Sequence, residues 1–177
     1  MLSRLTLILL LSALSACSVR FPQIDRLMEI IEEPENPIER ILWQANIGGV
    51  SQDVIPITAE QGSVYANKQG ASLVYDGFIV RTIETFSQQI RHIDIRDEQV
   101  GDTITREVWV DYRPVATWTC DIWRVETLLS STQQCESLGV TRINRRQLNP
   151  QGELIDLQQY LGIDDLELQL KKKITNQ

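Results

Sequence analysis

Apolar and polar side chains alternate with a period of two from about Val54 to near the end of this chain, and no other feature restricts its fold as strongly. Short alternating stretches separated by Gly-containing dipeptides are typical of β-strands joined by tight turns. The expected strands are 54–58, 63–67, 71–75, 78–85, 89–96, 103–112, 116–129, 140–148 and a last one through Leu166, Leu168 and Leu170. They predict a mainly β, antiparallel domain, either a sandwich or barrel-like.

Gly-containing pairs supply most of the expected turns. The pair Asp76-Gly77 predicts a two-residue hairpin, because a type I′ turn needs positive φ at both central residues. Further turns are expected at Gln61-Gly62, Gln69-Gly70, Arg113-Pro114 and Asn149-Pro150-Gln151-Gly152.

Three short helices are expected beside the strands, two N-terminal and one C-terminal. The first has one apolar face and ends before Pro34, and the second begins with Asn36 as N-cap and ends at Gly48-Gly49. The third ends at Gly162. Their apolar faces are, in order, Ile24, Leu27, Met28 and Ile31; Ile38, Ile41, Leu42 and Ala45; and Leu154, Leu157 and Leu161.

The first seventeen residues have the parts of a bacterial export signal. Arg4 supplies the positive charge, residues 5–11 form an apolar run too short to span a bilayer, and small residues follow. The ending Leu14-Ser15-Ala16-Cys17 resembles the lipobox of bacterial lipoproteins, which implies cleavage before Cys17 and acylation of that cysteine. The alternative is a plain signal peptide followed by an incidental cysteine.

The expected organisation is a lipoprotein signal peptide at 1–16, a lipidated tether with a short helix at 17–36, and a single β-rich periplasmic domain at 37–177. A lipoprotein cysteine carries more than one acyl chain, so it anchors the protein stably in the membrane. Ser18 stands where enterobacterial lipoproteins retained at the inner membrane have Asp, and this resemblance favours the outer membrane.

The chain is acidic, with a formal net charge of −7. This charge gives nucleic-acid binding no electrostatic support, and it disfavours gripping an anionic polysaccharide along its length. Contact with a protein through exposed strand edges is the expected mode of action. The basic clusters Arg145-Arg146 and 171–173 are expected to be solvated surface.

The stretch 63–82, SVYANKQGASLVYDGFIVRT, and the later Val108-Trp109-Val110-Asp111 resemble the YjbF/GfcB group of lipoproteins, which are encoded with exopolysaccharide and group 4 capsule systems. The resemblance spans about 54–124. It implies a non-catalytic accessory of polysaccharide secretion or assembly, with an outer-membrane export protein or the polysaccharide as partner. This chain departs from the group in having Ile83-Glu84-Thr85 where a Gly is expected, and in being shorter.

Three of the four tryptophans, Trp109, Trp118 and Trp123, lie close together in the sequence and are candidate contacts for a glycan or a partner. Trp118 and Trp123 are five residues apart, so an unbroken strand would point them to opposite faces. A single stacking platform for sugars is therefore not expected, and at least one of them is expected in the core.

Cys120 and Cys135 are the two cysteines that remain after lipidation, and an oxidising compartment favours a disulfide between them. The turn-prone residues 130–132 complicate this pairing, because a hairpin turning there would place Cys120 opposite about Thr141. Two buried free thiols are the alternative.

The sequence offers little that indicates catalysis. With His92 as its one histidine it predicts no metal site, and without nucleotide-binding or hydrolase motifs it predicts no cofactor. The acidic pairs Asp97-Glu98 and Asp164-Asp165 would support a glycan-modifying enzyme only if the fold set two carboxylates across a cleft. An enzyme is therefore not expected, and a generic scaffolding lipoprotein of the envelope is the main alternative to the polysaccharide accessory.

Overall fold

The computed structural model describes residues 42–59 and 62–173 of the chain. The signal peptide, Cys17, the tether and the helix expected at 24–31 lie outside these residues. Within the described part every regular element is a strand, and it contains no helix long and apolar enough to cross a membrane.

Thirteen strands make up this part of the chain. They are β1 (Trp43–Ile47), β2 (Val50–Ala59), β3 (Gly62–Ala66), β4 (Ser72–Tyr75), β5 (Val80–Glu84), β6 (His92–Val100), β7 (Thr103–Val110), β8 (Arg113–Asp121), β9 (Arg124–Thr127), β10 (Ser130–Ser137), β11 (Val140–Leu148), β12 (Leu154–Tyr160) and β13 (Glu167–Lys172).

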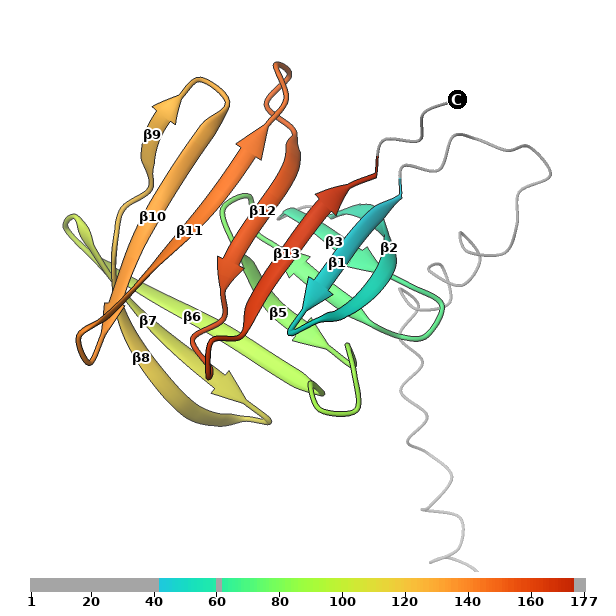
Figure 1. Ribbon diagram of the computed structural model, residues 1–177, viewed down its shortest axis with the longest axis horizontal. Coiled ribbons are helices and arrows are strands. Elements are labelled where there is room, and N and C mark those ends of the chain that lie inside the picture. The colour runs from blue at the N-terminus through green and yellow to red at the C-terminus, as the bar shows by residue number, and fades with distance from the viewer. Residues whose placement is uncertain (1–41, 60–61, 174–177) are drawn as a thin grey trace, which may run out of the picture. The chain divides into compact units, whose positions relative to one another are not determined.

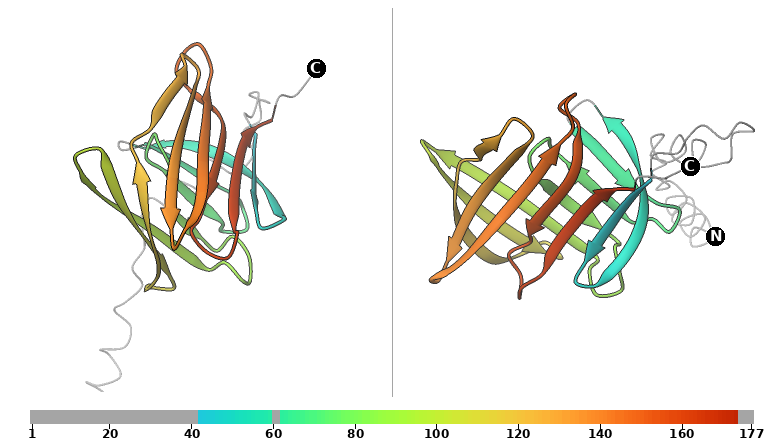
Figure 2. Two further views of the ribbon diagram at one scale, coloured as in Figure 1. Left: turned by 60° about the vertical axis from the view of Figure 1, so that its left-hand side comes forward. Right: turned by 45° about the horizontal axis from the view of Figure 1, so that its top comes forward.

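The strands close into an antiparallel barrel. From β1 to β8 each strand pairs with the next in the chain, β10 to β13 do the same, and the ring closes through β13–β1 and β8–β10. Twelve strands thus form the barrel, while β9 pairs with β10 outside the ring. Figure 1 shows β10 to β13 and β1 in front of β5 to β8, and Figure 2 shows the same wall from two further sides. Of the two architectures expected from the alternation, the barrel-like one is confirmed.

An apolar core fills much of the barrel, with buried side chains from β1 to β8, β12 and β13. Leu73, Ile83, Leu157 and Leu168 are completely buried there, and Trp43 packs edge-on against Tyr65 with ring centroids 5.0 Å apart. Each such side chain contributes about 1.5–3 kcal/mol through its removal from water. This packing makes one part of the barrel a rigid support for the more polar part.

Two of the expected helices are wrong where the structure describes them. Residues 43–47 form β1, in which Trp43, Ala45 and Ile47 alternate inward, and Gly48-Gly49 makes a two-residue hairpin turn with positive φ at both positions. The C-terminal segment 154–160 is β12. A register shift opposite Leu148 places an extra residue between Leu154 and Leu157, so both point inward with the three-residue spacing of a helix.

The turn expected as type I′ at Asp76-Gly77 is also different. Only Gly77 has positive φ, and the β4–β5 loop runs from Asp76 to Ile79. The Asp76 carboxylate accepts hydrogen bonds from the backbone N–H groups of Phe78 and Ile79, at 2.8 and 2.9 Å. This side-chain cap lengthens the loop and leaves Phe78 49% exposed at its tip.

Candidate functional site

Polar side chains occupy the part of the barrel interior lined by β6, β7, β8, β10 and β11. On each strand every second side chain points into the barrel, so the same alternation places both these polar residues and the apolar residues of the core inside. Four buried polar or charged residues lie on these strands, Arg106, Ser131, Gln133 and Asn144, while the buried Gln159 on β12 bonds to the backbone of Val80. A buried polar group needs a hydrogen-bond partner, and the following contacts provide them.

A carboxylate shared by two arginines lies at the centre of this polar region. Asp97 on β6 faces Arg106 on β7 and accepts two hydrogen bonds from its guanidinium, both 2.8 Å long. Arg81 on β5 approaches the same carboxylate at 3.0 Å. Burial raises the pKa of Asp97, but the hydrogen bonds and charges of Arg106 and Arg81 outweigh it and hold the pKa below its ordinary value.

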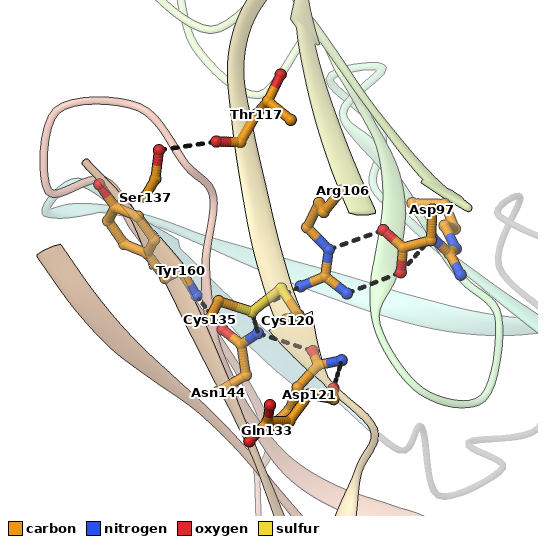
Figure 3. Close-up of a disulfide and its surroundings, with 11 residues drawn as sticks. Asp97, Arg106, Thr117, Cys120, Asp121, Gln133, Cys135, Ser137, Asn144 and Tyr160 are labelled. Atoms are coloured by element: carbon orange, nitrogen blue, oxygen red, sulfur yellow. Dashed lines mark hydrogen bonds and ion pairs between the residues drawn. A yellow bond between two sulfur atoms is a disulfide. The ribbon is translucent and has the colours of Figure 1, made fainter. Parts of the chain in front are cut away.

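A disulfide between Cys120 on β8 and Cys135 on β10 lies beside Arg106, with an S–S distance of 2.05 Å (Figure 3). The two cysteines are direct cross-strand partners. The turn expected at 130–132 is wrong, since Thr127 pairs with Ser130 and the chain turns at Leu128-Leu129. A register shift between β9 and β10, together with the break between β8 and β9, then brings the cysteines opposite each other.

Side chains of β10 and β11 complete the network around the disulfide (Figure 3). The Asn144 amide donates to the Gln133 side chain at 3.1 Å, and its oxygen accepts from the Tyr160 backbone N–H at 2.8 Å. Gln133 in turn donates to the Asp121 carbonyl at 3.0 Å. These bonds fix the orientation of each amide.

The polar region opens at one end of the barrel into a pocket of about 430 Å³, here called the mouth pocket. Its volume is within the range of small-molecule sites, about 300–1,000 Å³. The apolar and aromatic side chains come from the β4–β5 loop, the β8–β9 junction and Ile104 of β7, and the polar ones from β5, β6 and β10. The residues that define it here are Phe78, Arg81, Asp97, Ile122, Trp123 and Gln133.

Arg146 on β11 contacts both aromatic residues of the mouth pocket, Phe78 and Trp123. Its guanidinium carbon lies 4.4 Å from the ring centroid of Phe78 and 5.1 Å from that of Trp123. It donates hydrogen bonds to Ser131 Oγ at 2.6 Å and to the Gly77 carbonyl at 2.7 Å. Arg145 is exposed as expected for solvated surface, but the same expectation is wrong for Arg146, which is half-buried and held by four contacts.

The three candidate tryptophans lie in three different environments. Trp118 is 7% exposed in the core and packs edge-on against Tyr160, which confirms the expected core tryptophan. Trp109 lies under the guanidinium of Arg96, 4.2 Å from its ring centroid, and donates to Glu107 at an exposed position. Trp123 alone lines the mouth pocket. The structure therefore does not bring these residues together into one contact surface.

Of the remaining sequence candidates, Asp97 lines the mouth pocket, whereas His92, Glu98, Asp164 and Asp165 do not. His92 stacks on Tyr112 with ring centroids 4.5 Å apart. Asp97 is held by arginines inside, whereas its neighbour Glu98 is exposed, and both Asp164 and Asp165 are exposed. Among residues 42–59 and 62–173, no group of three or more His, Cys, Asp or Glu side chains could hold a metal ion.

Sequence reasoning found Trp123 but missed Phe78, Arg81, Gln133 and Arg146. A signal was present for Arg146, because it occupies an inward position of the strand expected at 140–148, where an apolar residue is expected. Phe78 carried no such signal, since its position at the mouth depends on the Asp76 cap.

The fold has a known relative among solved structures. No protein-family model and no curated protein matches the sequence. The structure is similar to the crystal structure of the hypothetical lipoprotein YmcC from Escherichia coli K12, with a TM-score of 0.57. The two sequences are 12% identical over 79% of this chain and 87% of that one. At this identity the similarity establishes a shared fold.

Proposed function

We propose that this protein is an outer-membrane lipoprotein that faces the periplasm and acts as a non-catalytic accessory in the secretion or assembly of an exopolysaccharide or capsule. The observation that carries the proposal is a barrel fold shared with a hypothetical lipoprotein, in a chain whose N-terminus resembles a lipoprotein signal ending at Cys17. The motifs that resemble the YjbF/GfcB group give the polysaccharide role, and they lie on β3, β4, β5 and β7.

The barrel restricts where a partner protein can add a strand. Closure gives every strand in the ring a neighbour on both sides, which leaves less unpaired edge than an open sheet would offer. Among the strands that the structure describes, β9 pairs on one side only. Its Val125 is 74% exposed, and Leu128 in the following turn is 95% exposed. An outer-membrane export protein can therefore dock at β9 through main-chain hydrogen bonds and these apolar side chains.

Recovery of the partner from envelopes tests this docking. The tagged lipoprotein should co-purify with an outer-membrane export protein from detergent-solubilised envelopes, and Val125→Lys combined with Leu128→Lys should abolish recovery, since charges on an edge block strand addition. Leu138→Lys is the matched control, because Leu138 is also fully exposed but lies in the β10–β11 turn. Equal recovery from both variants would reject β9 as the docking site, and recovery of no envelope partner would favour the generic scaffold.

A further inference from the structure

The mouth pocket and Arg146 together form a positively charged region on an otherwise acidic protein. Arg81 and Arg106 are balanced by Asp76 and Asp97, since Arg81 contacts Asp76 at 2.6 Å and both arginines contact Asp97. Arg146 adds one further positive charge, and within residues 42–59 and 62–173 no carboxylate lies within salt-bridge distance of it. The local charge is thus +1, whereas the whole chain carries −7.

The guanidinium of Arg146 is held in place but retains donor capacity. Nε and Nη1 donate one hydrogen bond each, to Ser131 Oγ and to the Gly77 carbonyl, and a guanidinium has five N–H groups in all. Contacts with Phe78 and Trp123 fix the plane of the guanidinium. An arginine orientated in this way by two aromatic rings suits an anionic oxygen, because a pre-organised fork loses little entropy when it binds.

The rest of the pocket suits a sugar more than a peptide or a lipid chain. Phe78, Ile122 and Trp123 supply flat or apolar surface at the opening, and Arg81, Asp97 and Gln133 supply donors and acceptors beneath it. A sugar ring has the same division, with apolar C–H faces and a hydroxyl perimeter. A lipid chain offers no hydrogen-bonding groups to the polar side chains beneath, whereas the hydroxyl groups of a sugar do.

We infer that the mouth pocket binds a uronic acid residue of an acidic polysaccharide, with the sugar ring against Phe78 and Trp123 and the carboxylate at Arg146. This inference rests on the proposed function, whose substrate class it specifies. It agrees with the acidic net charge, because one pocket engages a single acidic sugar and the remaining surface repels the polymer. The protein would therefore contact the polymer at one sugar only and would release it readily.

The test measures the affinity of the full lipidated protein, in detergent micelles, for tri-galacturonic acid by titration of tryptophan fluorescence. Arg146→Gln should weaken binding about tenfold or more, the range for losing a hydrogen bond to a charged group. Arg145→Gln is the matched control, since Arg145 is the adjacent residue of the same strand and is exposed on the other face. It should bind like the wild type.

A second experiment compares two ligands on the wild-type protein. Its result remains valid even if Arg146→Gln disturbs the fold of the barrel. The wild-type protein should bind tri-galacturonic acid at least tenfold more tightly than its methyl ester, which is neutral. Equal affinity for acid and ester, or no binding of the acid, would overturn the inference. Binding of an aspartate-rich peptide as tight as that of the acid would also overturn it, because the site would then recognise an anionic protein segment.

The outcomes separate this inference from the proposed function. If loss of the gene reduces surface polysaccharide but the protein binds no uronate, the proposed function stands and the uronate site is wrong. If the protein binds uronate as described but loss of the gene leaves surface polysaccharide unchanged, the site stands and the proposed role in secretion fails.

Discussion

Arg106 is 3% exposed, and it is the one charged residue among the buried residues of the described chain. Taking a guanidinium out of water costs several kcal/mol, and two hydrogen bonds to Asp97 offset this cost. Its Nη1 also lies 3.7 Å from Cys135 Sγ, so the ion pair and the disulfide pack as one unit. The polar part of the barrel therefore depends on a carboxylate that must stay ionised.

Replacement of Asp97 by Asn should lower the free energy of unfolding by about 3–5 kcal/mol at pH 7, because Arg106 would remain buried without its counter-charge. The pKa of Asp97 is below its ordinary value of 3.8, so the stabilisation is complete above that pH and is lost as pH falls through the lower, folded-state pKa. The difference between wild type and Asp97→Asn should therefore narrow on acidification below about pH 4.

Urea unfolding at pH 7 and at pH 3 or below measures this narrowing. Asp102→Asn is the control, since Asp102 is exposed in the β6–β7 turn, and it should change stability by less than about 0.5 kcal/mol. A difference between wild type and Asp97→Asn that stays constant with pH would show that the charge of Asp97 does not stabilise the fold.

At the scale of single residues, the sequence indicated which residue types matter better than it indicated where their side chains lie. The core placement of a tryptophan followed from the spacing of Trp118 and Trp123, but nothing in that spacing showed that β8 ends at Asp121 and frees Trp123 to reach the mouth. The pair Arg145-Arg146 was expected to be solvated surface. The buried contacts of Arg146 could not be predicted, because its two aromatic neighbours come from the β4–β5 loop and the β8–β9 junction, far away in the sequence.

The pairing of β8 with β10 is the shortest in the ring. It has two paired positions, whereas β5 and β6, the next shortest, have three. Side-chain bonds continue the seam on both sides of the disulfide: Ser137 donates to the Thr117 carbonyl at 2.7 Å, and Gln133 donates to the Asp121 carbonyl (Figure 3). The disulfide thus holds the barrel closed where backbone pairing is weakest.

Removal of the disulfide by Cys120→Ser with Cys135→Ser should lower the free energy of unfolding by about 3 kcal/mol, the value expected for a link between residues 15 apart. Amide exchange should rise first at β8 and β10. The wild type unfolded in reductant should match the double variant. A loss below about 1 kcal/mol, or free thiols that react in periplasm-folded protein without reductant, would contradict this role of the bond.

Strands were predictable as elements because alternation survives in most of them, and β11 was predicted with its observed bounds. Errors arose at β1 and β12, where helices were expected, and at β10, where no strand was expected. In β12 the extra residue makes Leu154 and Leu157 imitate a helical face, and at β1 the Gly48-Gly49 turn imitates a helix stop. Local pattern cannot separate these cases, since cross-strand register decides them.

Closure of the sheet is a property of the whole molecule and was not predictable from any segment. It depends on β13 meeting β1 and on β10 meeting β8, and the first of these pairings joins strands from opposite ends of the described chain. Among the described residues, closure leaves β9 as the strand that pairs on one side only, and the mouth pocket opens at one end of the barrel. Both lie outside the features that composition and motifs could reveal.

The two surfaces suggest how an accessory protein would work. In the proposed role, a lipid at Cys17 would confine the protein to the membrane, and a tether of about 20 residues at 3.3–3.6 Å each would let the barrel reach a neighbouring export protein. Docking at β9 would hold the mouth pocket close to the emerging polymer. In this account no catalytic step is required, because repeated capture and release of single acidic sugars would guide a polysaccharide chain without altering it.

The amount of polysaccharide on the surface of cells that lack this gene tests the proposed role most directly. The deletion strain should lose most surface uronic acid, and the wild-type gene should restore it, whereas Cys17→Ser should not, since its precursor remains unprocessed and unlipidated. Wild-type levels of surface polysaccharide in the deletion strain would contradict the account and leave a generic scaffolding role in the envelope.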